Sequence, residues 1–179
     1  GGIAIFSDLN EASESDLRRA EIIALPLVLI ALVVVFGSIV AAGLPLVMGL
    51  VSITTTLALV YLLAQTTDMS IFVLNIASFL GLGMAIDYTL LMVSRFREEL
   101  ASRTVEEAVA VTCATAGKAI LFSAATSVIG LSGLLFFDFM MLRSLGIGGM
   151  AVILLSMLLA LSLVPALLGA LGERVNSLS

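Results

Sequence analysis

The stretch of sequence that decides the fold is residues 22–67, which carries no charged side chain over 46 positions and reads IIALPLVLIALVVVFGSIVAAGLPLVMGLVSITTTLALVYLLAQTT. A helix needs about 20 apolar residues to cross roughly 30 Å of hydrocarbon, so this stretch is long enough for two crossings. Gly37-Ser38 and Gly43-Leu44-Pro45 interrupt it in the middle. We therefore expect membrane helices over residues 17–38 and 44–65.

The rest of the chain repeats this apolar pattern. Three further membrane helices are predicted over residues 70–94, 119–137 and 144–172. Between the first two of these lies a polar segment, residues 97–118, which we expect to form an amphipathic linker helix. Thr104 and Glu107 have the spacing of a capping box within it. The predicted fold class is an all-α membrane bundle of five transmembrane helices.

The first residues are of another kind. Residues 3–6 have the character of a short β-strand, but the chain encodes no sheet for that strand to join. We therefore expect residues 1–13 to end a large extracytoplasmic domain, and residues 14–175 to form the transmembrane domain.

Charge predicts how the bundle is oriented. With five crossings, the side that holds the linker helix and the C-terminal end carries five Lys or Arg residues, whereas the other side carries three. Cytoplasmic loops are enriched in Lys and Arg, so we expect a cytoplasmic C-terminus and an extracytoplasmic N-terminus.

Composition excludes several classes of function. The 179 residues are 61% hydrophobic and 12% charged, with a mean hydropathy of +1.24, whereas soluble chains are about 45–50% apolar and about 25% charged. A net charge of −5 with a single lysine argues against nucleic-acid binding. There is no histidine and only one cysteine, Cys113, so we expect no metal site and no cofactor. No nucleophile has a base beside it in the sequence, so nothing argues for an enzyme.

Asp87 is the only charge within the span predicted over residues 70–94. A carboxylate at mid-membrane costs at least about 2.5–3.5 kcal/mol, and such residues are candidates for proton or ion transfer by default. The adjacent Tyr88 can donate its phenolic hydrogen to a neighbouring acceptor. Gly83, Ser123 and Thr126 are possible relay or packing neighbours of this pair. The alternative is that Asp87 is a structural hydrogen-bonding or ion-pairing group.

Small residues recur at helical spacing on three of the predicted spans. They let membrane helices approach closely, so we expect ordinary close packing along these faces. The residues are Ala77, Gly81 and Ala85; Ala119, Ser123, Ser127 and Gly130; and Gly149, Ser156 and Ala160.

Residues 75–100, NIASFLGLGMAIDYTLLMVSRFREEL, resemble the MMPL (mycobacterial membrane protein large) transporters of the resistance-nodulation-division superfamily. The likeness extends over essentially the whole chain. The family usually has arginine where Lys118 stands and a proline near Asp138, and this chain departs from it at both positions. The other matching segments are 16–26, 36–45, 116–123 and 142–146.

The resemblance implies that the chain supplies helices two to six of the N-terminal half of a transporter in a bacterial plasma (inner) membrane. In the family, an Asp-Tyr pair placed as Asp87 and Tyr88 are meets an equivalent pair from the second half, and the two pairs carry protons that drive export of lipids or other hydrophobic molecules. The implied partners are the second half, the porter domains, the bilayer and a hydrophobic substrate. A second interpretation is a lipid- or sterol-binding sensor module without coupled transport.

Overall fold

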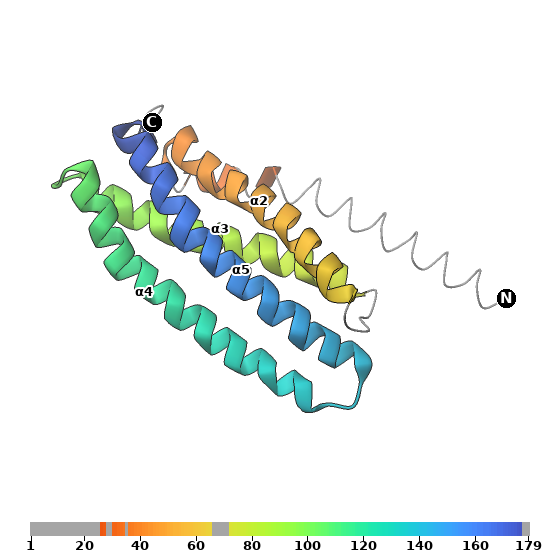
Figure 1. Cartoon of the computed structure of the whole chain (residues 1–179). Helices are drawn as coiled ribbons and strands as arrows, with labels where there is room; N and C mark the ends of the chain where they lie inside the picture. Colours follow the sequence, from red (N-terminus) through yellow and green to blue (C-terminus); the bar gives the residue numbers. More distant parts are fainter. Residues whose placement is uncertain (1–25, 28–29, 35, 66–71, 177–179) are drawn as a thin grey trace.

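The computed structural model describes residues 26–27, 30–34, 36–65 and 72–176, and four long helices dominate it (Figure 1). Each of the four is long and apolar enough to cross a membrane, which confirms the all-α membrane bundle. The helices are α2 (Ile39–Ala64), α3 (Phe72–Leu100), α4 (Val105–Ser132) and α5 (Met140–Leu171), with 3-10 turns η1 (Gly133–Phe136) after α4 and η2 (Gly172–Asn176) after α5.

The predicted count of five differs from these four because the first predicted helix, residues 17–38, lies partly outside the described residues. Within it, residues 26–27, 30–34 and 36 are helical. The strand expected at residues 3–6 and the domain boundary at residue 13 lie outside the described residues altogether.

The bundle is arranged around α3 and α5. These two helices pack against each other, α2 packs against both on one side, and α4 packs against both on the other (Figure 1). Successive helices run in opposite directions, so the turn at residues 101–104 lies at the same end of the bundle as η2 and the start of α2. We call this the basic end, after Arg95, Arg97, Arg103 and Arg174.

The turn into α2 is made by two residues. Gly37 has a φ of +59°, a backbone conformation that residues other than glycine rarely adopt. Its N–H donates to the carbonyl of Val33 at 2.7 Å. Ser38 then caps α2, because its Oγ accepts from the N–H of Ala41 at 3.4 Å. The start predicted at residue 44 is therefore wrong by five residues. Pro45 lies inside α2 and does not begin it. Membrane helices tolerate such an internal proline.

The linker helix predicted over residues 97–118 is also wrong as a separate element. Helix α3 continues through that segment's first residues to Leu100, held by the i,i+4 ion pair of Arg95 with Glu99 at 2.5 Å. After a short turn, the predicted capping box of Thr104 and Glu107 is confirmed, and it begins α4. Helix α4 then runs without a break through Lys118 to Ser132.

Three helices approach closely at a seam at Gly81, where α3 meets α2 and α5. The Ser52 hydroxyl on α2 donates to the Gly81 carbonyl at 2.9 Å, and the Ser156 hydroxyl on α5 lies 3.4 Å from the Ser52 hydroxyl. Because a serine has one donor, Ser156 donates in the second pair. The small residues predicted to pack on α3 and α5 are indeed buried. Together these contacts fix how α3 is rotated about its axis.

A second set of contacts, at the basic end, holds together α3, η2 and the residues before α2. Arg97 on α3 donates to the carbonyl of Phe36 at 2.5 Å and to the Asn176 side chain at 2.6 Å. Its guanidinium also lies 5.8 Å from the centre of the Phe36 ring, within cation–π range. Beside it, the Ser38 hydroxyl donates to the carbonyl of Val175 at 2.8 Å. Helix α3 thereby connects the residues before α2 with η2.

The outer surface of the bundle carries many large apolar side chains, as a lipid-facing surface requires. On a soluble protein, contiguous apolar patches of this extent are rare. The most exposed of them are Val34, Leu50, Tyr61, Phe122, Ile129 and Phe136, all at least 66% accessible.

Gly81→Ala tests the seam. A Cβ at this position would lie 2.8 Å from Thr56 Oγ1, 3.1 Å from Val152 Cγ1 and 3.3 Å from Ser52 Oγ. Overpacking typically costs about 1–3 kcal/mol, more than the helix-propensity gain of about 1 kcal/mol. We expect a lower thermal midpoint for the full-length protein in detergent.

Gly43→Ala is the matched control, because nothing lies within 4 Å of a Cβ there, and its midpoint is expected to stay or rise. Equal midpoints for the two variants would contradict the close approach at Gly81.

Candidate functional site

Asp87 lies near the middle of α3, on the face opposite the seam, and its side chain is exposed. It is eight residues, about 12 Å, along the helix from Arg95 at the basic end. Among the described residues, it forms no ion pair and no hydrogen bond. The structural alternative, in which Asp87 is held by a partner, therefore finds no partner within the described part of the chain.

Tyr88 points the other way, into the bundle. Only 5% of its surface is accessible, and its buried hydroxyl has no hydrogen-bond partner among the residues described. The Ser123 side chain on α4 lies within interaction range of that hydroxyl. Asp87 and Tyr88 are thus adjacent in sequence but face different surroundings, one outward and one toward α4.

The antiparallel register of α3 and α4 places the remaining candidates. Arg95 Nε donates to Thr115 Oγ1 at 3.3 Å, and Tyr88 lies near Ser123. By this register Ser123 is level with Asp87. Ser123 is exposed on the same side of the bundle, so the structure brings it close to the Asp-Tyr pair.

Gly83 and Thr126, the other two predicted neighbours, make no contact with the Asp-Tyr pair among the described residues. Gly83 is exposed one turn before Asp87, and nothing lies within 4 Å of a Cβ built there. The Thr126 hydroxyl donates to the carbonyl of Phe122 in its own helix at 2.8 Å, so the structure does not place it against Asp87.

Lys118 lies closer to Asp87 than the sequence predicted. The sequence placed it at a span end, but α4 is continuous, and the register sets Lys118 level with Met92. That is five residues, or about 7.5 Å, from Asp87 along the helix axis. Its side chain is exposed, and it forms no ion pair with any described residue.

The small residues predicted to pack on α4 behave differently from those on α3 and α5. Ala119, Ser123 and Gly130 are exposed, and Ser127 is half-buried, so this face does not pack within the described bundle. The buried side of α4 is formed by Ala108, Thr112, Ala116, Gly117, Ile120 and Ala124.

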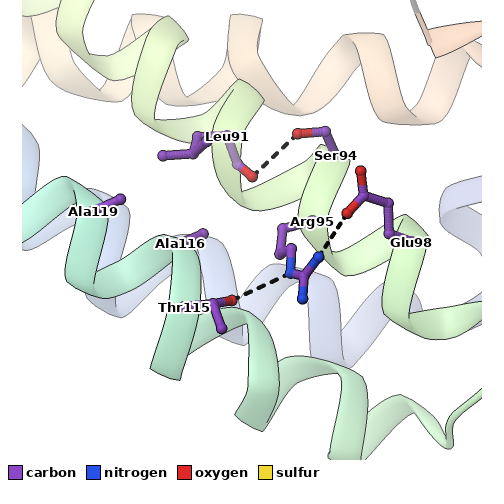
Figure 2. Close-up of a pocket in the computed structure, with 7 residues that line it drawn as sticks. All are labelled: Leu91, Ser94, Arg95, Glu98, Thr115, Ala116 and Ala119. Carbon is purple, nitrogen blue, oxygen red and sulfur yellow. Dashed lines mark hydrogen bonds and ion pairs between the residues drawn. The ribbon is translucent and has the colours of Figure 1, made fainter.

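A groove between α3 and α4, toward the basic end, was missed by the sequence analysis. Figure 2 shows Arg95 reaching from α3 toward Thr115 on α4, with Glu98 beside it. The only signal for it in the sequence was Arg95 itself, because treating residues 97–118 as a separate helix hid the pairing of α3 with α4. Within the described ranges, no cluster of metal-ligating side chains occurs.

Comparison with known proteins places the chain in a family. The family model described as the MMPL family matches residues 1–178. The chain belongs to the MMPL family. The resemblance carried by the Gly, Asp, Tyr and Arg positions of α3 is thereby confirmed.

Among its relatives, this MMPL chain is 43% identical to a membrane protein of Streptomyces coelicolor, over 98% of the chain and 25% of that protein. It is 43% identical to the trehalose monomycolate exporter MmpL3 of Mycobacterium tuberculosis, over 99% of the chain and 20% of the exporter. It is 37% identical to the mycolic acid-containing lipids exporter MmpL11 of Mycolicibacterium smegmatis, over 95% of the chain and 18% of that exporter. The chain therefore spans about a fifth to a quarter of the length of these relatives.

Tyr88→Phe tests whether the Tyr88 hydroxyl is unpaired. A buried hydroxyl without a partner costs about 1–3 kcal/mol, so its removal is expected to leave the thermal midpoint of the full-length protein unchanged or higher.

Ser52→Ala is the control, because it removes a paired buried hydroxyl. It is expected to lower stability by about 1 kcal/mol. A loss as large for Tyr88→Phe as for Ser52→Ala would mean that the Tyr88 hydroxyl is bonded in the full-length protein.

Proposed function

We propose that this MMPL chain is the transmembrane unit of a proton-driven exporter of lipids or other hydrophobic molecules, with Asp87 and Tyr88 as its proton-carrying pair. The observation that carries the proposal is the exposed carboxylate of Asp87 at mid-helix, without an ion-pair partner among the described residues. The printed functions of the MmpL3 and MmpL11 relatives support a lipid substrate. They equally support a transporter over an enzyme.

The chemistry that we propose is reversible protonation of one carboxylate. A charge that crosses about 100 mV of membrane potential is worth roughly 2.3 kcal/mol, which is enough to bias a rearrangement of packed helices. Asp87 would take up a proton from one side of the membrane and release it to the other. Tyr88, with Ser123 near its hydroxyl, would sense the charge of Asp87 and transmit it to the packing between α3 and α4.

We further propose that the Asp87 face is covered by the second half of the transporter. Leaving a charged carboxylate against lipid costs at least about 2.5–3.5 kcal/mol. Around Asp87 this face carries small or hydroxyl-bearing residues that suit helix packing. These are Gly83, Ala119 and Ser123, all exposed, with the larger Leu91 exposed one turn further along α3. In this arrangement the basic end would face the cytoplasm of a bacterial cell, in line with the excess of Lys and Arg there.

Asp87→Asn tests the function. Proteoliposomes that hold the full-length protein are given a proton gradient, and efflux of a labelled lipid or a hydrophobic dye is measured. A neutral amide keeps the size of the side chain but cannot carry a proton, so we expect gradient-driven efflux to fall about tenfold or more.

Asp138→Asn is the matched control, because it removes an exposed carboxylate from the turn before α5, and full efflux is expected. Full efflux by a correctly folded Asp87→Asn protein would refute the proton-carrier role. Ligand binding without gradient-driven efflux in both wild type and variant would favour the sensor module instead.

A further inference from the structure

The connection between α4 and α5 exposes large apolar side chains at the end of the bundle opposite the basic end (Figure 1). We call that end the far end, and residues 135–140, LFFDFM, the aromatic turn. Phe136 is 89% accessible, and Phe137, Phe139 and Met140 are each more than half accessible. Turns that face water are normally polar, whereas the only charged residue of this one is Asp138. The aromatic turn therefore needs an apolar environment.

The inner side of the aromatic turn is packed on α5, which fixes its outer side. A Cβ built on Gly146 would lie 3.2 Å from Leu134 Cβ and 3.2 Å from Leu135 Cδ2. On the α5 side of the turn, the N–H of Arg143 donates to the carbonyl of Phe139 at 3.1 Å. Peptide groups that are paired in this way can lie next to hydrocarbon. The phenylalanines project outward because the leucines before them occupy the contact with α5.

The length of α4 places the aromatic turn at a definite depth. The bond from Arg95 to Thr115 sets these two residues at one level near the basic end. From Thr115 to Ser132, α4 rises about 26 Å at 1.5 Å per residue, and η1 adds about 8 Å at 2 Å per residue as far as Phe136. A tilt of about 20° shortens the total of about 34 Å to about 32 Å. The hydrocarbon layer is roughly 30 Å thick, so Phe136 lies at its far boundary.

Helix α5 gives a similar depth independently. A Cβ on Gly146 would lie 3.2 Å from the carbonyl oxygen of Leu131, so these two residues are level. Leu131 is about 24 Å along α4 from Thr115, and Arg143 lies about 4.5 Å beyond Gly146. Arg143 and Asp138 are exposed, and neither forms an ion pair with a residue that the structure describes. At this depth both charges can reach the lipid headgroups.

The aromatic turn continues an exposed apolar face of α4. Phe122, Ile129 and Phe136 follow one another at intervals of seven residues, which keeps them on one side of a helix, and each is at least 72% accessible. Beyond Phe136, neighbouring residues of the turn are exposed as well, and neighbours in sequence do not share one face. Fluid acyl chains can surround such a turn, whereas a flat protein surface would cover one side of it.

We propose that the aromatic turn is inserted in the membrane, at the boundary between headgroups and acyl chains of the leaflet at the far end. Its phenylalanines lie among the acyl chains, and Asp138 lies among the headgroups. The partner of this surface is the phospholipid leaflet itself. The aromatic turn thereby holds the far ends of α4 and α5 at a fixed depth, so α4 can tilt or rotate against α3 but does not shift across the membrane. None of this depends on the role of Asp87.

Spin labelling of the full-length protein tests the depth of the aromatic turn. Phe136→Cys is made in a background where Cys113 is serine and any other cysteines are replaced. The protein is labelled with a nitroxide and reconstituted in phosphatidylglycerol–phosphatidylcholine vesicles. Collisions of the label with oxygen, which concentrates among acyl chains, and with a water-soluble nickel chelate are then measured. We expect frequent collisions with oxygen and few with nickel, with a ratio several times that of the control.

Asp138→Cys is the matched control, because it labels the same turn at the residue that we place among the headgroups. Phe139→Cys repeats the measurement on the α5 side, so the test does not depend on one variant folding. Lipids labelled on the headgroup or near the top of an acyl chain calibrate the depth.

Two results would overturn the proposal. Nickel collisions as frequent at positions 136 and 139 as at position 138 would place the aromatic turn in water. Few collisions with either reagent at positions 136 and 139 would mean that protein covers the turn, as another domain or a second copy would. Gradient-driven efflux by Asp87→Asn is a separate measurement, so failure of the membrane-inserted turn leaves the proposed function intact, and failure of that function leaves the turn intact.

Discussion

The close approach of three helices at Gly81 is the constraint on which the rest of the structure depends. A residue without a side chain lets α2 and α5 reach the backbone of α3, where the Ser52 hydroxyl donates to the Gly81 carbonyl. In a bilayer there is little hydrophobic force between helices, so such contacts decide how helices pack. Because the seam turns one face of α3 inward, it turns the opposite face, with Gly83 and Asp87, outward. The position of the carboxylate is thus a consequence of packing on the other side of its helix.

The basic end adds a second constraint, which acts along the helices. Arg97 joins α3 to the backbone before α2 and to η2, while Arg95 joins α3 to α4. These two arginines lie two residues apart and so point to different neighbours. A movement of α4 relative to α3 therefore changes the contact of Arg95 with Thr115, whereas the contacts of Arg97 hold α3 to the residues before α2. On the proposed function, this makes the contact between α3 and α4 the one that a change of charge at Asp87 can alter.

Much of this structure could be predicted from the sequence, for identifiable reasons. Apolar length and absence of charge are properties of a segment by itself, so the membrane helices were predicted correctly in kind. The capping box at Thr104 and the break at Gly37-Ser38 are local as well. The exact residues at which the helices begin and end were less predictable. Pro45 looked like a helix start but is accommodated inside α2, because Ser38 had already capped the helix.

The errors arose where charge was taken to end a helix. Arg95, Glu98 and Glu99 were treated as the close of a span, yet they continue α3 through their own ion pairs. The same assumption put Lys118 at the start of a helix, whereas it lies midway along α4. Once α3 and α4 were separated in this way, the pairing of Arg95 with Thr115 could not be foreseen. Contacts between helices depend on register and rotation, which no single segment encodes.

The exposed face around Asp87 differs in composition from the rest of the surface of the bundle. Elsewhere the outside of the bundle carries large apolar side chains such as Val34, Leu50 and Phe122. Beside Asp87 several exposed residues are instead small or polar, with Gly83 on α3 and Ala119 and Ser123 on α4, although the apolar Leu91 is also exposed one turn away. Lipid gains little from contact with such residues and would leave a carboxylate unsolvated. The physically consistent covers are a packed helix and water. On the proposed function, the packed helix comes from the second half of the transporter, which covers Asp87.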